Sequence, residues 1–100
     1  MIIRKLSAMP YAQAHVEINE NSDICLFSYV TLVAWIDRDG WCGCTGTYSQ
    51  TTRKHISAFA KEYAAPLDYY SFKQAHAGGY VVNKHTGEVL SYGDYAHLGE

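Results

Sequence analysis

The stretch that decides the fold of this chain runs from Tyr48 to Tyr63 and reads YSQTTRKHISAFAKEY. It opens with hydroxyl side chains, which can accept hydrogen bonds from the unpaired amides of a first helical turn. Apolar residues then recur at the spacing of one helical face, at Ile56, Phe59, Ala60 and Tyr63. The stretch therefore predicts a helix over about residues 51–64, and Pro66 cannot continue it.

Strand-like sequence precedes this helix. Residues 24–36 are β-branched and aromatic, and Ser28-Tyr29 can mark a bend within them. Residues 37–40 (DRDG) are a turn signal, after which the chain returns as a second strand over residues 41–45. A four-residue loop would pair Ile36 with Trp41, whereas a two-residue turn would pair Trp35 with Cys44. The sequence leaves both registers open, and a slip of one residue exchanges the two faces of the strand.

The remaining segments are shorter or less regular. The pattern predicts a hairpin over residues 80–83 and 88–92, and a short edge strand over residues 2–6. We expect an extended, aromatic segment over residues 67–75 and a mobile tail from Gly93 onward. Residues 8–21 fit either a helix or a strand. We therefore expect a single α+β domain over residues 1–100, with an antiparallel sheet of four to five strands and one main helix on one face.

Composition excludes several functional classes. The net charge of −2 and the charged fraction of 18% are typical neither of a basic nucleic-acid-binding domain nor of a strongly acidic DNA mimic. No signal peptide and no membrane-spanning run is visible, and an odd number of three cysteines fits a reducing compartment. We expect a cytoplasmic protein that makes no membrane contact.

Tyrosine is unusually frequent, with nine residues in 100. Tyrosine gives a large contact area at a low entropic cost and is enriched at protein interfaces. Small sheet proteins also use it on half-exposed strands, so abundance alone does not establish an interface. An exposed edge strand together with surplus tyrosines could also support a homodimer.

Five residues are the candidate contacts with a partner. Arg53, Lys54 and His55 cluster at the front of the predicted helix, where free amides and basic side chains attract anions, although a solvated helix face has the same pattern. Tyr69 and Tyr70 are adjacent, so at least one of them should be exposed in an extended segment. Such a surface would suit a protein partner, or the stacking of single-stranded bases.

Cys42 and Cys44 are a weaker candidate for a metal site. Two thiolates two residues apart lie on one face of a strand, but structural zinc sites need a matching second pair that this chain lacks. Small buried cysteines explain the same pattern. No pair of residues favours acid–base or nucleophilic catalysis, and we expect no catalytic residue and no cofactor.

The runs LFSYVTLVA (residues 26–34) and YSQTTRKHI (residues 48–56) resemble a family of short phage-encoded proteins of unknown function. The family pattern is a Ser-Tyr-x-Thr-x-Val-Ala strand, a hairpin, and a Tyr-Ser-x-Thr-Thr-x-x-His-Ile helix start that ends near Lys-Glu-Tyr. The resemblance covers roughly residues 24–63, and Cys42-Gly43-Cys44 departs from the pattern. It implies a phage or prophage origin and supplies no catalytic residues.

Small phage proteins of this kind often inhibit a host protein, and anti-CRISPR proteins are one such class. The leading hypothesis is therefore a non-enzymatic binding protein that inhibits or redirects a host factor, with a CRISPR effector as one candidate. The first alternative is a module that binds nucleic acid or a nucleotide phosphate at the helix front. The second alternative is a small metal protein that uses Cys42, Cys44 and a histidine.

Overall fold

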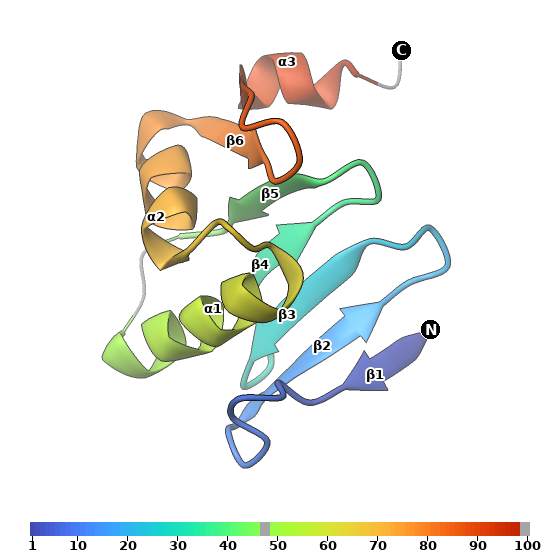
Figure 1. Ribbon diagram of the computed structural model, residues 1–100, viewed down its shortest axis with the longest axis vertical. Coiled ribbons are helices and arrows are strands. Elements are labelled where there is room, and N and C mark those ends of the chain that lie inside the picture. Colours follow the sequence, from blue (N-terminus) through green and yellow to red (C-terminus); the bar gives the residue numbers. More distant parts are fainter. Residues whose placement is uncertain (47–48, 99–100) are drawn as a thin grey trace.

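The described part of the chain, residues 1–46 and 49–98, contains seven strands that pair in sequence order to form one antiparallel sheet in this computed structural model (Figure 1). The strands are β1 (Ile2–Arg4), β2 (Ala14–Ile18), β3 (Ile24–Ser28), β4 (Thr31–Ile36), β5 (Trp41–Cys44), β6 (Tyr80–Asn83) and β7 (Val89–Ser91). The helices are α1 (Gln50–Tyr63), α2 (Tyr69–Gly78) and α3 (Tyr92–Ala96). Tyr48, which belongs to the family-like motif, lies outside the described residues.

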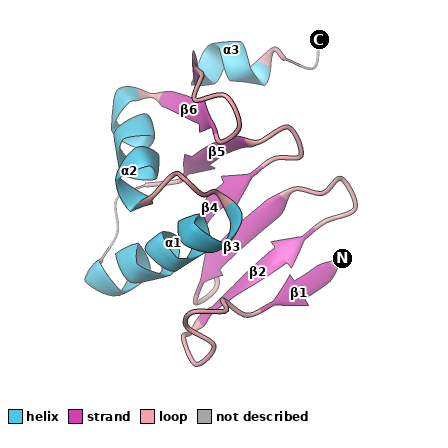
Figure 2. Ribbon diagram, viewed as in Figure 1, coloured by secondary structure: helices cyan, strands magenta, loops and turns pink. Residues whose placement is uncertain are grey.

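Two of the helices form a layer on one face of the sheet. α1 packs over β3 and β4, whereas α2 packs over β5 and β6 (Figure 2). The core between these layers is contiguous, and its largest fully buried apolar side chains are Phe59, Phe72, Leu6, Leu26, Ile36 and Ile56. Removing these side chains from water supplies the main driving force for docking the helices on the sheet.

The main helix forms where the sequence predicts it. Ser49 is its N-cap and its Oγ accepts a hydrogen bond from the amide of Thr52 at 3.4 Å. Ile56, Phe59 and Ala60 are fully buried, which confirms the predicted apolar face. The helix ends at Tyr63, before Pro66, because proline lacks the amide that a further turn requires.

The hairpin between β4 and β5 has a register that the sequence did not predict. Ile36 pairs with Cys42 and Trp35 with Gly43, so both registers considered above are wrong. The amide of Asp37 donates to the carbonyl of Trp41 at 2.9 Å, which leaves a three-residue loop. Gly40 closes this loop at φ +94°, a conformation that glycine adopts without a steric cost.

The sheet and the helix layer are both larger than predicted. The sheet has seven strands rather than four to five, because residues 14–18 form a strand and residues 24–36 form two strands, β3 and β4. Residues 69–78 are helical rather than extended. The amide of Ser71 donates to Asp68 Oδ1 at 3.0 Å and the amide of Asp68 donates to Ser71 Oγ at 3.4 Å, which is a capping box at the start of α2.

The segment from Gly93 onward was predicted to be a mobile tail, but residues 92–96 form the helix α3. Ser91 caps the short helix α3, and its Oγ accepts from the amide of Asp94 at 3.1 Å. Tyr95 then fixes this helix to the sheet. Its ring centroid lies 5.4 Å from that of Trp35, and its hydroxyl donates to Asp37 Oδ2 at 2.7 Å.

Candidate functional site

A surface pocket of about 300 Å³ lies where the first turns of α1 and α2 meet. Its lining residues are Gln50, Arg53, Lys54, Ser57, Tyr69 and Tyr70. Four of the five sequence-predicted contact residues therefore converge on one site, although they come from two helices. Ser49 caps the start of α1, which carries the pocket residues from positions 50 to 57. Asp68 caps the start of α2, which carries the two tyrosines.

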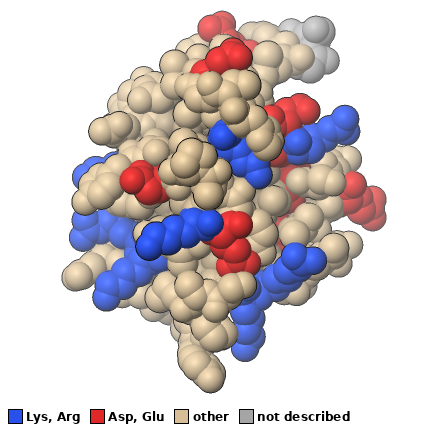
Figure 3. Space-filling model, in the orientation of Figure 1, with Lys and Arg blue, Asp and Glu red and all other residues tan. Residues whose placement is uncertain are grey.

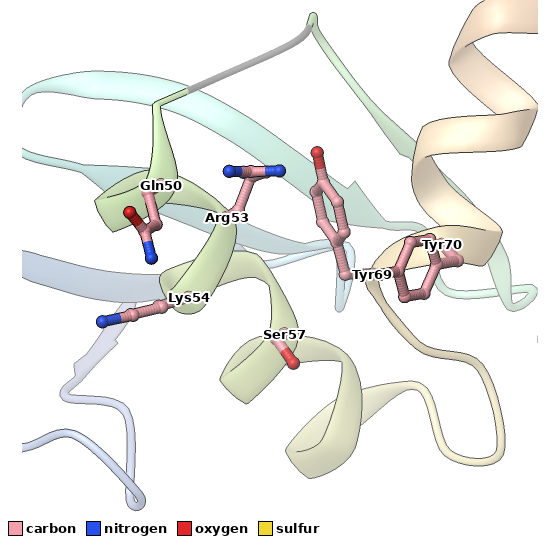
Figure 4. A pocket seen from close by; sticks show the side chains of 6 residues that line it. All are labelled: Gln50, Arg53, Lys54, Ser57, Tyr69 and Tyr70. Carbon is pink, nitrogen blue, oxygen red and sulfur yellow. The ribbon is translucent and has the colours of Figure 1, made fainter.

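The side chains of this pocket offer both aromatic surface and positive charge. In Figure 4 the guanidinium of Arg53 points toward the ring of Tyr69, while Lys54 extends in the opposite direction. The rings of Tyr69 and Tyr70 meet edge to face with centroids 5.8 Å apart. Tyr69 packs partly against the core, whereas 66% of Tyr70 is exposed. Tyr70 thus presents an aromatic ring that is largely exposed to solvent.

The electrostatics of the pocket favour an anionic group. No carboxylate is among its lining residues, and several of the Lys and Arg side chains lie together at the left edge of the space-filling view (Figure 3). Burial raises the pKa of the Tyr69 hydroxyl, and the positive charge of Arg53 opposes part of this effect. Tyr69 therefore stays neutral at physiological pH and can donate a hydrogen bond.

His55 does not lie in this pocket, which differs from the sequence-based expectation. Only 2% of its surface is exposed, and its Nδ1 lies 2.9 Å from the hydroxyl of Ser28 on β3. The same hydroxyl lies 3.1 Å from Thr52 Oγ1. Ser28, Thr52 and His55 thus form a buried polar network that ties the start of α1 to the sheet. In this position His55 cannot contact a partner, so we assign it a structural role.

This network gives the first testable prediction. Burial lowers the pKa of His55, so the unfolded chain takes up its proton at a higher pH than the folded chain. The contribution of neutral His55 to the free energy of unfolding is complete above about pH 6.5, the pKa of a histidine in the unfolded chain. This contribution is lost as the pH falls below that value. We expect the urea midpoint of unfolding to fall between neutral pH and about pH 5, and to fall less in His55→Asn.

His85→Asn is the matched control for this prediction, because His85 is an exposed histidine. This variant should keep the pH dependence of the wild type. An equal pH dependence in His55→Asn and the wild type would show that His55 is not held neutral by the fold.

Cys42 and Cys44 are buried in the core. The thiol of Cys42 donates to the carbonyl of Gly40 at 3.2 Å, and that of Cys44 donates to the carbonyl of Phe72 at 3.4 Å. Burial raises the pKa of Cys42 to about 12 and also raises that of Cys44, which disfavours the thiolate form that binds metals. Within residues 1–46 and 49–98, no three His, Cys, Asp or Glu side chains are grouped as a metal site would require.

Sequence reasoning missed two parts of this arrangement. Gln50 and Ser57 line the pocket, and their spacing from Arg53 and Lys54 on a helix could have indicated this. The partnership of Ser28 with His55 joins residues 27 positions apart, and only the docking of α1 on β3 brings them together. Both residues do fall in the motif runs quoted above.

Comparisons with known proteins identify a family but no activity. A family model described as "Family of unknown function (DUF8033)" matches residues 4–75, which include both motif runs and all six lining residues of the pocket. No curated protein and no solved structure matches this chain. Among the residues that the structure describes, no helix has the length and apolar character needed to cross a bilayer.

Proposed function

We propose that this chain, which belongs to the Family of unknown function (DUF8033), is a non-enzymatic protein that binds a host protein and inhibits or redirects it. A phage or mobile-element origin follows from the sequence resemblance, with action in the cytoplasm of the bacterial host. A CRISPR effector is one candidate for the partner, which would make the chain an anti-CRISPR inhibitor.

The observation that carries this proposal is the pocket between α1 and α2. Arg53, Tyr69 and Tyr70 are residues of the types that dominate the energetics of protein interfaces. Basic side chains without a lining carboxylate complement an acidic segment of the partner. The net charge of −2 argues against binding that depends on the charge of the whole chain.

The test starts from a captured partner. A tagged form of the chain is used to capture proteins from a bacterial host, the partner is identified by mass spectrometry, and its affinity is measured with purified components. In the Arg53→Ala/Tyr70→Ala double variant we expect a loss of about 100-fold in affinity, because interface residues of these types often contribute 2 kcal/mol or more. The melting temperature should not change, since both side chains are exposed or line the pocket.

Arg38→Ala/Tyr11→Ala is the matched control variant. It removes the same two residue types from exposed positions outside the pocket, and 97% of Tyr11 is exposed. This control should bind with wild-type affinity. Unchanged binding in the Arg53→Ala/Tyr70→Ala variant, or its failure to fold, would count against the proposal.

A nucleic acid is the second candidate partner, and one observation favours it. The pocket combines two cations with two aromatic rings, which is the chemistry that binds phosphates and stacks bases. Salt dependence separates the two candidates. Affinity for single-stranded nucleic acid that falls steeply with salt would favour phosphates, whereas a weak response would favour a protein.

A further inference from the structure

A second cavity lies on the opposite face of the sheet from α1. Ile36 belongs to the core under the helices, and side chains alternate along β4, so Trp35 points to the other face together with its cross-strand partner Cys25. The helix α3 adds Tyr95 to this face. The cavity has a volume of about 230 Å³ and its lining residues are Asp23, Cys25, Leu32, Trp35, Ile36, Asp37 and Tyr95.

The aromatic wall of this cavity is closely packed on both sides. The ring of Trp35 lies over the backbone of Gly43, where a Cβ atom would come within 2.7 Å of Trp35 Cζ2. Tyr95 stacks on Trp35 at an interplanar angle of 28° and meets Trp41 edge to face at 6.3 Å. Glycine at position 43 therefore allows the indole to lie flat, and the tyrosine fixes it from the other side.

Two carboxylates stand beside this wall. Asp37 accepts hydrogen bonds from the amides of Asp39 and Trp41 at 2.9 Å each and from the Tyr95 hydroxyl. Asp23 accepts from the amide of Arg38 at 3.3 Å. Neither carboxylate is in an ion pair with a lysine or arginine of the described chain, so their negative charge is not neutralised.

The pKa of Tyr95 reports the same electrostatic field. Burial raises it above its ordinary value, and the carboxylates of Asp37, Asp23 and Asp39 raise it further. The charges of these carboxylates, which disfavour a tyrosinate at this place, favour a cation.

We propose that this cavity binds a lysine or arginine side chain from a basic segment of a partner protein. The aliphatic stem of such a side chain would lie against Leu32 and Trp35, and its cationic end would reach Asp23 and Asp37. Both faces of the Trp35 ring are covered, by Gly43 and by Tyr95, so the cationic end would gain chiefly from its charge complementarity with the two carboxylates. The site is independent of the pocket between α1 and α2, and it would let one chain contact a basic and an acidic surface.

The experiment uses the full chain and three acetylated, amidated peptides of alternating glycine with arginine, citrulline or glutamate. Binding is followed by NMR through the indole N–H signals of Trp35 and Trp41. We expect the arginine peptide to shift the Trp35 signal in a saturable way at millimolar concentrations, and the uncharged citrulline peptide to bind about tenfold more weakly. The glutamate peptide should leave this signal unchanged.

Two variants and two controls complete the test. Tyr95→Leu and Asp23→Asn should each weaken binding of the arginine peptide about tenfold, because the first removes the side chain that stacks on Trp35 and holds Asp37, and the second removes a charge. Glu88→Gln, which changes the same charge at an exposed site, and Arg53→Ala/Tyr70→Ala should bind as the wild type does. Unfolding curves confirm that each variant is folded.

Several results would overturn the inference. They are the absence of a Trp35 shift, equal binding of the arginine and citrulline peptides, and binding that both Tyr95→Leu and Asp23→Asn leave unchanged. Self-association of the wild type that Tyr95→Leu abolishes would show that a second copy of the chain occupies this face. Because the double variant in the first pocket serves only as a control, failure of the host-partner proposal leaves this result intact.

Discussion

Replacing Phe59 with alanine is expected to lower the free energy of unfolding by about 3–5 kcal/mol, the largest loss from a single substitution predicted for this chain. The side chain is fully buried, and its ring centroid lies 5.4 Å from that of Tyr63 and 6.4 Å from that of Phe72. It therefore joins α1 to α2 as well as to the sheet. Alanine at this position would leave a cavity that its neighbours cannot fill.

Urea unfolding followed by far-UV circular dichroism measures this loss. Phe59→Leu should cost less, because it retains most of the apolar volume. Lys61→Ala, at an exposed position of the same helix, should change stability by no more than about 0.5 kcal/mol. A loss below about 1 kcal/mol in Phe59→Ala would contradict the packing of the two helices described above.

Replacing Asn83 with alanine is expected to cost about 1–3 kcal/mol, because several buried or partly buried polar groups lose their partner together. The side chain is 6% exposed. Its Nδ2 donates to the carbonyl of Asp39 at 3.1 Å, and its Oδ1 accepts from the amides of His85 at 2.9 Å and Thr86 at 3.3 Å. Asn83 thus connects the turn after β4 to the turn after β6.

The same unfolding measurement tests this connection. Asn83→Asp should also be destabilising, since a carboxylate still accepts from the two turn amides but places a charged oxygen against the carbonyl oxygen of Asp39. Asn21→Ala, at an exposed turn, should be close to neutral. If Asn83→Ala is as stable as the wild type, the side chain does not hold the two turns together.

The sequence predicted the elements that depend on local chemistry. α1 follows from a hydroxyl cap and an apolar stripe, and both lie within the stretch that forms it. The break between β3 and β4 was expected at Ser28-Tyr29, and the structure places a two-residue connection, Tyr29-Val30, there. The hairpin of β6 and β7 was also predicted, from two β-branched runs around a turn that contains Gly87.

The elements that were missed depend on long-range contacts or on a weaker signal. The aromatic residues after Pro66 have a high β-propensity, which outweighed the capping signal of Asp68 and Ser71. α3 is too short to be predicted from periodicity, and Tyr95 anchors it to residues more than 50 positions earlier. Local sequence cannot specify such a contact.

The candidate site was predicted in its composition but not in its geometry. Arg53 and Lys54 were predicted at the front of α1, and at least one of the two tyrosines was expected to be exposed. The helical form of residues 69–78 brings these tyrosines to the pocket. His55 was wrongly predicted to be a contact residue. Its hydrogen bond with Ser28 on β3 depends on the docking of α1 on the sheet, which the local sequence does not indicate.

Site-specific photocrosslinking to the captured partner tests the central claim most directly. A photoreactive phenylalanine is placed at position 70 in one sample and at position 11 in another, both exposed tyrosine positions. The account predicts a covalent adduct with the partner from position 70 and none from position 11. An adduct from position 11 together with none from position 70 would contradict the claim that the partner binds between α1 and α2.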